Sequence, residues 1–145
     1  MKNLDHALEL LAQTTKPVLP REFFETIYST ASFDERGKLY DFYLTFGASV
    51  FGDGEDGRAR GELFLLEYLS ACLGVDKGHG DHMGCYESGW EIARLIGESL
   101  RTGNNSFATK LIDVIDRAYV EGDHQRRTCI ETACLEHVCE NPAQL

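Results

Sequence analysis

The sequence lacks any long apolar run and contains few prolines. No stretch approaches the roughly 18 consecutive apolar residues of a membrane span, and the opening residues, MKNLDH, have no apolar segment typical of a secretory signal. Only three prolines occur in 145 residues, and no low-complexity tract interrupts the chain. We therefore expect a single helical domain over residues 1–145 that is cytoplasmic and does not bind a membrane.

Basic side chains are scarce relative to acidic ones. Fourteen Lys and Arg residues stand against 24 Asp and Glu, which gives a formal net charge of −10. Binding to nucleic acid needs clustered Lys and Arg to neutralise phosphates, so this balance argues against a nucleic-acid partner. An acidic surface attracts a basic one, and the sequence therefore favours a basic protein partner. The alternative is that the charge serves solubility alone.

Strand-like alternation of apolar and polar residues is also missing, whereas helical spacing recurs along most of the chain. Apolar residues at this spacing predict an all-α fold, a compact bundle or short helical-hairpin stack of six to seven helices. The predicted helices cover residues 3–14, 21–31, 35–51, 61–73, 88–102, 105–121 and 123–138, and Ser88 is the predicted cap of the fifth.

The string GDGEDG, residues 52–57, matches the glycine pattern of a dinucleotide-binding loop. Such a loop needs a preceding strand and room for phosphate charge, but here a predicted helix precedes the glycines and three carboxylates lie among them. A calcium loop counted from Asp53 fails as well, because its twelfth position is Phe64 and not a glutamate. We expect residues 52–60 to form a flexible acidic loop that can contact a partner.

The segment GVDKGHGDHMGCYESGW, residues 74–90, is rich in side chains that bind metals. His79, His82 and Cys85 are spaced by three residues each and could hold zinc or another transition metal. A structural zinc site usually takes two separated pairs of ligands, and no CxxC pair exists among the five cysteines. We therefore predict no resident metal or cofactor, and we interpret residues 74–89 as a long helix connector that serves as a binding edge.

No strong catalytic pattern is present. Cys134 and His137 lie one helical turn apart, but both fall on the apolar face of the last predicted helix, where cysteine behaves as a small hydrophobic residue. We therefore expect a binding protein and not an enzyme. The alternatives are a small metal-binding protein that uses His79, His82 and Cys85, and a small helical enzyme. The predicted partner-binding residues come from the two connectors and the helix that follows the second: Asp53, Glu55, Asp56, Asp76, His79, Asp81, His82, Tyr86 and Trp90.

One family resemblance lies in the C-terminal third. KLIDVIDRAYVEGDHQRRTCIETACLEHV, residues 110–138, contains a helix, a Gly-Asp break and a helix with Ile130, Leu135 and Glu136. It resembles the closing helix pair of small helical bacterial immunity proteins and related domains found beside polymorphic toxins. The resemblance implies a cytoplasmic protein that neutralises a toxin domain by covering its active site.

Overall fold

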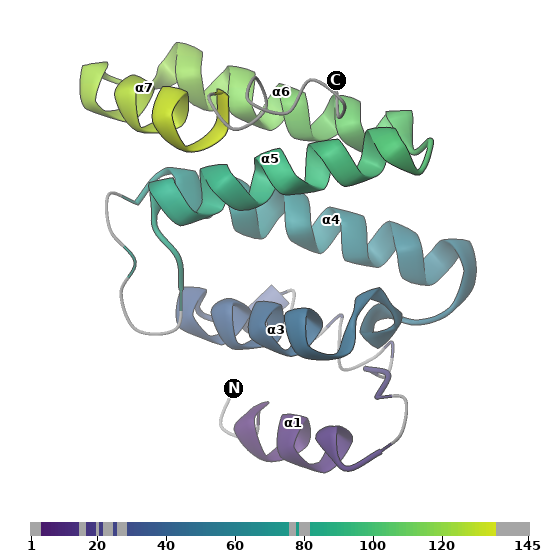
Figure 1. The fold of residues 1–145 in the computed structure, drawn as a ribbon. Coiled ribbons are helices and arrows are strands. Elements are labelled where there is room, and N and C mark those ends of the chain that lie inside the picture. The colour runs from purple at the N-terminus through teal and green to yellow at the C-terminus, as the bar shows by residue number, and fades with distance from the viewer. Residues whose placement is uncertain are drawn as a thin grey trace. The chain divides into compact units, whose positions relative to one another are not determined.

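The predicted all-α fold is confirmed. The computed structural model describes residues 4–14, 17–19, 21, 25, 29–75, 78 and 82–135 (Figure 1). In these ranges the chain forms helices and no strand. The helices are α1 (Leu4–Ala12), α3 (Phe33–Phe46), the 3-10 helix η1 (Ala48–Phe51), α4 (Gly54–Leu73), α5 (Cys85–Arg101), α6 (Asn105–Glu121), α7 (His124–Ile130) and the π-helical turn η2 (Glu131–Leu135). Most of the predicted helix 21–31 lies outside the described residues.

The chain divides into two compact units. The first comprises Met1–Leu65 and Gly80–His82, and the second comprises Leu66–His79 and Met83–Leu145. Helix α4 contributes its first part to one unit and its second part to the other. The single domain over residues 1–145 stays a prediction.

In the first unit, α3 begins at a capping box. The Ser32 side chain accepts a hydrogen bond from the Glu35 amide at 3.2 Å, and the Glu35 carboxylate accepts one from the Ser32 amide at 3.0 Å. The helix predicted for residues 35–51 is interrupted at Gly47, whose φ of +90° ends α3 before η1 begins. The chain therefore turns within the predicted range, and η1 brings Phe51 into the core.

The core of the first unit is largely aromatic. Tyr40 and Phe51 are 2% and 1% exposed, and the Phe51 ring packs against Tyr43 at 5.8 Å and Phe64 at 5.4 Å between centroids. Helix α1 joins this unit through Leu4, which is buried, and through an ion pair between Asp5 and Lys38 at 3.0 Å. Phe64 comes from α4, so the first part of that helix completes the core.

In the second unit, α5 lies beside α6 and α7 (Figure 1). Its core is aliphatic and includes Ile92, Leu111 and Ile130, each fully buried. The helix boundaries follow sequence signals: Asn104 caps α6 by accepting from the Phe107 amide, and Asp123 caps α7 by accepting from the Arg126 amide at 2.8 Å. None of the helices in the described ranges is long and apolar enough to cross a membrane.

Candidate functional site

The first predicted contact segment, residues 52–60, is mostly helical and not a loop. Helix α4 starts at Gly54, seven residues before its predicted start, so the expectation of a flexible loop over residues 52–60 was wrong. Asp53 precedes the helix, while Glu55 and Asp56 lie in its first turn, and all three are exposed. Carboxylates at this end of a helix interact favourably with the helix dipole. Their position therefore has a structural explanation besides partner binding.

The glycines of GDGEDG build the corner where α4 begins. Gly52 and Gly54 have φ values of +113° and +74°, which residues other than glycine rarely adopt. Gly57 packs directly on Gly52, since a Cβ at Gly57 would lie 1.9 Å from the Gly52 carbonyl oxygen. Arg60 then donates to the Phe51 carbonyl from Nε and Nη2, at 3.2 and 3.0 Å. The pattern is explained by backbone packing and not by phosphate binding.

The second predicted contact segment, residues 74–89, is described only in part. Asp76, His79 and Asp81 lie outside the described residues. The two ends of the segment are tied together: the Cys85 amide donates to the Val75 carbonyl at 2.6 Å, and the Met83 amide donates to the Tyr68 hydroxyl at 3.3 Å. These two bonds hold the described residues on either side of the segment close together.

Helix α5 starts three residues earlier than predicted. Its first residue is Cys85, and the N-cap is Gly84, whose amide donates to the Glu87 carboxylate at 3.2 Å. Ser88 was predicted to be the cap, but it lies inside the helix, is buried, and its hydroxyl donates to the Cys85 carbonyl. The earlier start places Tyr86 on the same helix as Trp90.

His82 belongs to the first unit and packs against α3. Its ring meets the Phe33 ring edge-on at 4.3 Å, and its Nε2 lies 3.8 Å from Asp34 Oδ1. Only 12% of the side chain is exposed. His82 therefore holds this part of the segment 74–89 against α3, and little of the surface of its ring is exposed to a partner.

Nothing in the described part of the chain gathers three His, Cys, Asp or Glu side chains around a metal position. Of the predicted ligand set, His79 lies outside the described residues. Cys85 is 1% exposed, and its thiol is a hydrogen-bonding neighbour of Cys129. The metal hypothesis for His79, His82 and Cys85 stays untested as a set.

The alternative thiol pair, Cys134 and His137, is likewise only half described, because His137 lies outside the described residues. Cys134 is 1% exposed, and burial raises its pKa to about 11. A nucleophilic cysteine requires the thiolate, which burial in apolar surroundings disfavours. Cys134 packs in the core, as the apolar pattern of its helix predicts.

Tyr86 and Trp90 form an exposed aromatic face on α5, which we call the α5 aromatic face. They are one helical turn apart, and 47% of Tyr86 and 56% of Trp90 is exposed. The opposite side of the helix carries Ile92 and Ile96, which are buried. An exposed tryptophan on a well-packed helix is typical of a contact residue, since Trp and Tyr are enriched at interfaces.

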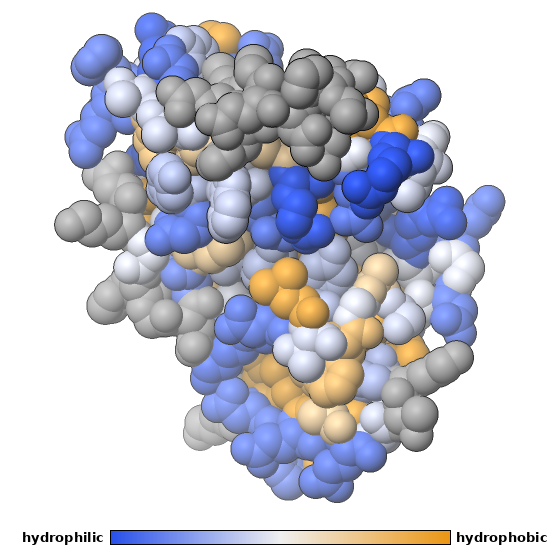
Figure 2. Space-filling view, viewed as in Figure 1, coloured by the Kyte–Doolittle hydropathy of each residue, from blue (hydrophilic) through white to orange (hydrophobic). Residues whose placement is uncertain are grey.

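Charged side chains continue from this aromatic pair along α5. Arg94 bonds to Glu91 on one side and to Glu98 on the other, the latter at 3.0 Å between Nη1 and Oε2. One arginine is thus matched by two carboxylates, and Glu87 adds another next to Tyr86. With Arg101 in its last turn, α5 carries three glutamates and two arginines, an excess of one negative charge beside its aromatic surface. Figure 2 shows the visible side of the molecule as mostly hydrophilic, with smaller hydrophobic areas between.

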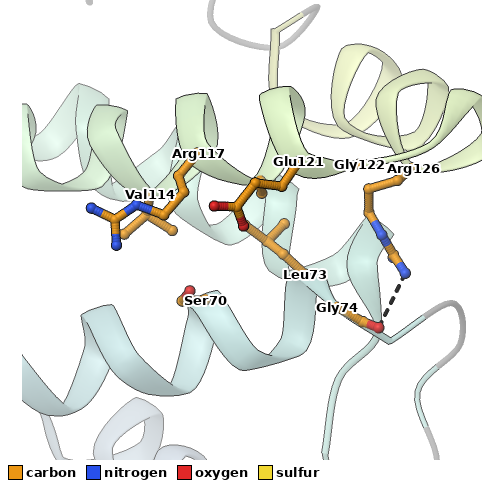
Figure 3. A pocket seen from close by; sticks show the side chains of 9 residues that line it. Ser70, Leu73, Gly74, Val114, Arg117, Glu121, Gly122 and Arg126 are labelled. Carbon is orange, nitrogen blue, oxygen red and sulfur yellow. Dashed lines mark hydrogen bonds between the residues drawn. The ribbon is translucent and has the colours of Figure 1, made fainter.

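A shallow hollow lies where the end of α4 meets α6 and α7 in the second unit (Figure 3). Its walls include Leu73, Val114 and Ala118, and its volume is about 240 Å³. Arg126 reaches from α7 to the Gly74 carbonyl at 3.1 Å and so satisfies a carbonyl at the end of α4. The hollow is smaller than the roughly 300 Å³ at which small-molecule pockets begin. Sequence reasoning missed it because three helices contribute to it.

The described chain is thus an all-α protein whose surface offers an aromatic helix face and a shallow hollow, both within the second unit. A family model described as a domain of unknown function (DUF7674) matches residues 69–144. This match covers just over half of the chain, from the later part of α4 through α5, α6 and α7, and the chain belongs to that family. No curated protein and no solved structure matches the chain.

Proposed function

We propose that this protein is a protein-binding module that uses the α5 aromatic face as the centre of its contact surface. The observation that carries the proposal is the exposure of Tyr86 and Trp90, one turn apart on a helix of the family-matched segment. Large aromatic side chains bury much area at low cost in conformational entropy, and they dominate binding energy at interfaces.

Helix α5 holds this face in place before any partner arrives. Its first turn is fixed by the bonds between Gly84 and Glu87 and between Cys85 and Val75, and its inner side packs against α6 and α7. A preformed helix face loses little conformational freedom on binding, so more of the contact energy contributes to affinity.

The partner that this face fits is a basic protein. The net charge of −10 steers a positively charged partner toward the molecule, and α5 itself carries three glutamates against two arginines. Asp53, Glu55 and Asp56 at the start of α4 add exposed negative charge in the first unit. The other contact residues predicted from the sequence are Asp76, His79, Asp81 and His82. Of these four, the structure describes only His82.

The finer proposal is an immunity-type inhibitor, a cytoplasmic and non-enzymatic protein that neutralises a bacterial toxin domain by covering its active site. It is supported by the acidic charge and by the resemblance of residues 110–138 to the closing helices of such proteins. A basic nuclease domain is the class of toxin whose surface charge would complement this chain.

Affinity capture from the source cell, followed by titration of the recovered partner, tests the proposal. Trp90→Ala should weaken binding by about 30-fold or more, as expected of an interface hot spot. Ile112→Ala is the matched control, because Ile112 is 49% exposed on α6 and not part of the α5 aromatic face. Equal affinity for both variants, or binding that does not weaken as salt rises, would contradict the proposed surface.

The immunity-type role needs a separate measurement. The captured partner should show a toxic or nuclease activity that this chain inhibits at equimolar concentration, and Trp90→Ala should relieve the inhibition. If the partner binds but keeps its full activity, the proposal of a protein-binding module stands and the proposal of an immunity-type inhibitor is refuted.

A further inference from the structure

Two cysteines that are distant in the sequence meet in the second unit. Cys85 is the first residue of α5, and Cys129 lies near the end of α7. The two thiols face each other where α5 packs on α7, and the Cys85 thiol is one cause of the raised pKa of Cys129. Both cysteines are reduced in the structure.

The packing of the two helices explains why these thiols meet. One turn beyond Cys85 is Gly89, and one turn beyond Cys129 is Ala133. A Cβ at Gly89 would lie only 3.0 Å from the Ala133 Cβ. Both steps are four residues toward the C-terminus, as expected of helices that run in the same direction, and α5 runs beside α7 in this way (Figure 1). The two cysteines therefore form the layer of contact that precedes Gly89 and Ala133. Small residues at one layer bring the backbones close at the neighbouring layer, and a disulfide requires such closeness.

We propose that Cys85 and Cys129 are a redox modification site, a dithiol that a small-molecule disulfide such as oxidised glutathione converts reversibly to an intramolecular disulfide. The inference is independent of the proposed binding function, because it rests on the contact between α5 and α7.

The chemistry balances with that oxidant. The Cys129 thiol loses its proton to solvent, and the thiolate attacks one sulfur of oxidised glutathione, which breaks that S–S bond and releases one glutathione thiolate. Cys85 then loses its proton, and its thiolate attacks the Cys129 sulfur of the mixed disulfide, which forms the protein disulfide and releases the second glutathione as a thiolate. The two glutathione thiolates take up the two protons that the cysteines lost. The protein is oxidised by two electrons, and one oxidised glutathione becomes two reduced ones.

The order of attack follows from access. Cys129 is half-buried, whereas Cys85 is 1% exposed, so a molecule of the size of glutathione reaches Cys129 first. Burial and the neighbouring Cys85 raise the pKa of Cys129 to about 12; Glu87 acts in the same direction, and Arg126 opposes it. The thiolate is therefore scarce at neutral pH, and oxidation should be slow and should accelerate about tenfold per pH unit.

The experiment uses the full chain in its folded state. It is incubated with mixtures of reduced and oxidised glutathione, quenched in acid, alkylated and mapped by peptide mass spectrometry. We expect a cross-linked peptide pair that contains Cys85 and Cys129, with two hydrogens lost from the intact mass, and full reversal by dithiothreitol. The thermal unfolding midpoint should rise on oxidation, because the bond restrains the unfolded chain.

Matched variants separate this pair from the other thiols. Cys85→Ser should stop at the mixed glutathione disulfide on Cys129, whereas Cys72→Ala, which removes a buried thiol outside the pair, should still form the cross-link. A wild-type map without the Cys85–Cys129 peptide, or with Cys129 only glutathionylated, would overturn the proposal. The wild-type result decides the question even where a variant fails to fold.

Discussion

Gly57→Ala offers a test in which local propensity and tertiary structure predict opposite signs. In the interior of a helix, replacing glycine by alanine normally stabilises it by about 1 kcal/mol. Here the added Cβ would lie 1.9 Å from the Gly52 carbonyl oxygen and 2.2 Å from the Gly52 carbonyl carbon. These are backbone atoms, which cannot rotate away as a flexible side chain could. The first turn of α4 must therefore move away from Gly52.

The size of the effect follows from what moves with that turn. Arg60 donates two hydrogen bonds to the Phe51 carbonyl, and only 22% of its side chain is exposed. Hydrogen bonds from charged groups contribute roughly 1.5–3 kcal/mol, and overpacking of a tight contact costs roughly 1–3 kcal/mol. After the gain in helix propensity is subtracted, we expect Gly57→Ala to lower the free energy of unfolding by about 1.5–5 kcal/mol.

Urea unfolding followed by far-ultraviolet circular dichroism measures this difference. Arg58→Ala is the matched control, because Arg58 is exposed on the same turn and its removal should change stability by no more than about 0.5 kcal/mol. A Gly57→Ala protein as stable as wild type would refute the packing of Gly57 on Gly52. It would also reopen a functional explanation of the glycine string.

Three further outcomes can be checked with purified protein. Trp90 is the one tryptophan in the chain and is 56% exposed. The wavelength of its fluorescence maximum should be near that of exposed indole in the free protein and should shift to the blue when a partner covers it. An unchanged spectrum on binding would contradict its place in the interface. Asp123→Ala should lower the free energy of unfolding by about 1 kcal/mol in urea titrations through loss of the N-cap of α7, and Asp123→Ser should restore most of it, which a purely electrostatic role would not allow. Burial raises the pKa values of Cys72 and Cys134 from their usual 9.0 to about 11, so the stability these neutral thiols contribute is present below about pH 9 and is lost as pH rises toward 11. Urea midpoints measured over this pH range should fall in wild type and fall less in Cys134→Ala.

Sequence reasoning located the helices well where the signals are local. The range predicted for the sixth helix and the start of the last helix at Asp123 agree with the structure, because a side chain within three residues supplies the capping bond. It also placed Cys134 on the apolar face of the last helix, and Cys134 is buried. The helical spacing of apolar residues alone selects the face that is buried.

It failed where a distant contact decides the backbone. Residues 52–60 were expected to form a loop because glycines and acids disfavour a helix, yet the approach of Gly57 to Gly52 and the bonds from Arg60 to Phe51 hold α4 together there. Ser88 was expected to cap α5, but the Cys85 amide bonds to Val75, ten residues away, so the helix starts earlier. Neither contact can be predicted from the spacing of apolar residues in the sequence.

The sequence by itself determined an all-α chain with a strong excess of acid, since apolar periodicity and charge are properties of local residue order. Only the tertiary structure decided what the unusual side chains do. Packing placed the His82 ring against Phe33, brought Cys85 to Cys129, and left Tyr86 and Trp90 on the outer side of α5. These arrangements depend on which helices lie side by side, because exposure and contact between distant residues are set by packing and not by spacing along the chain.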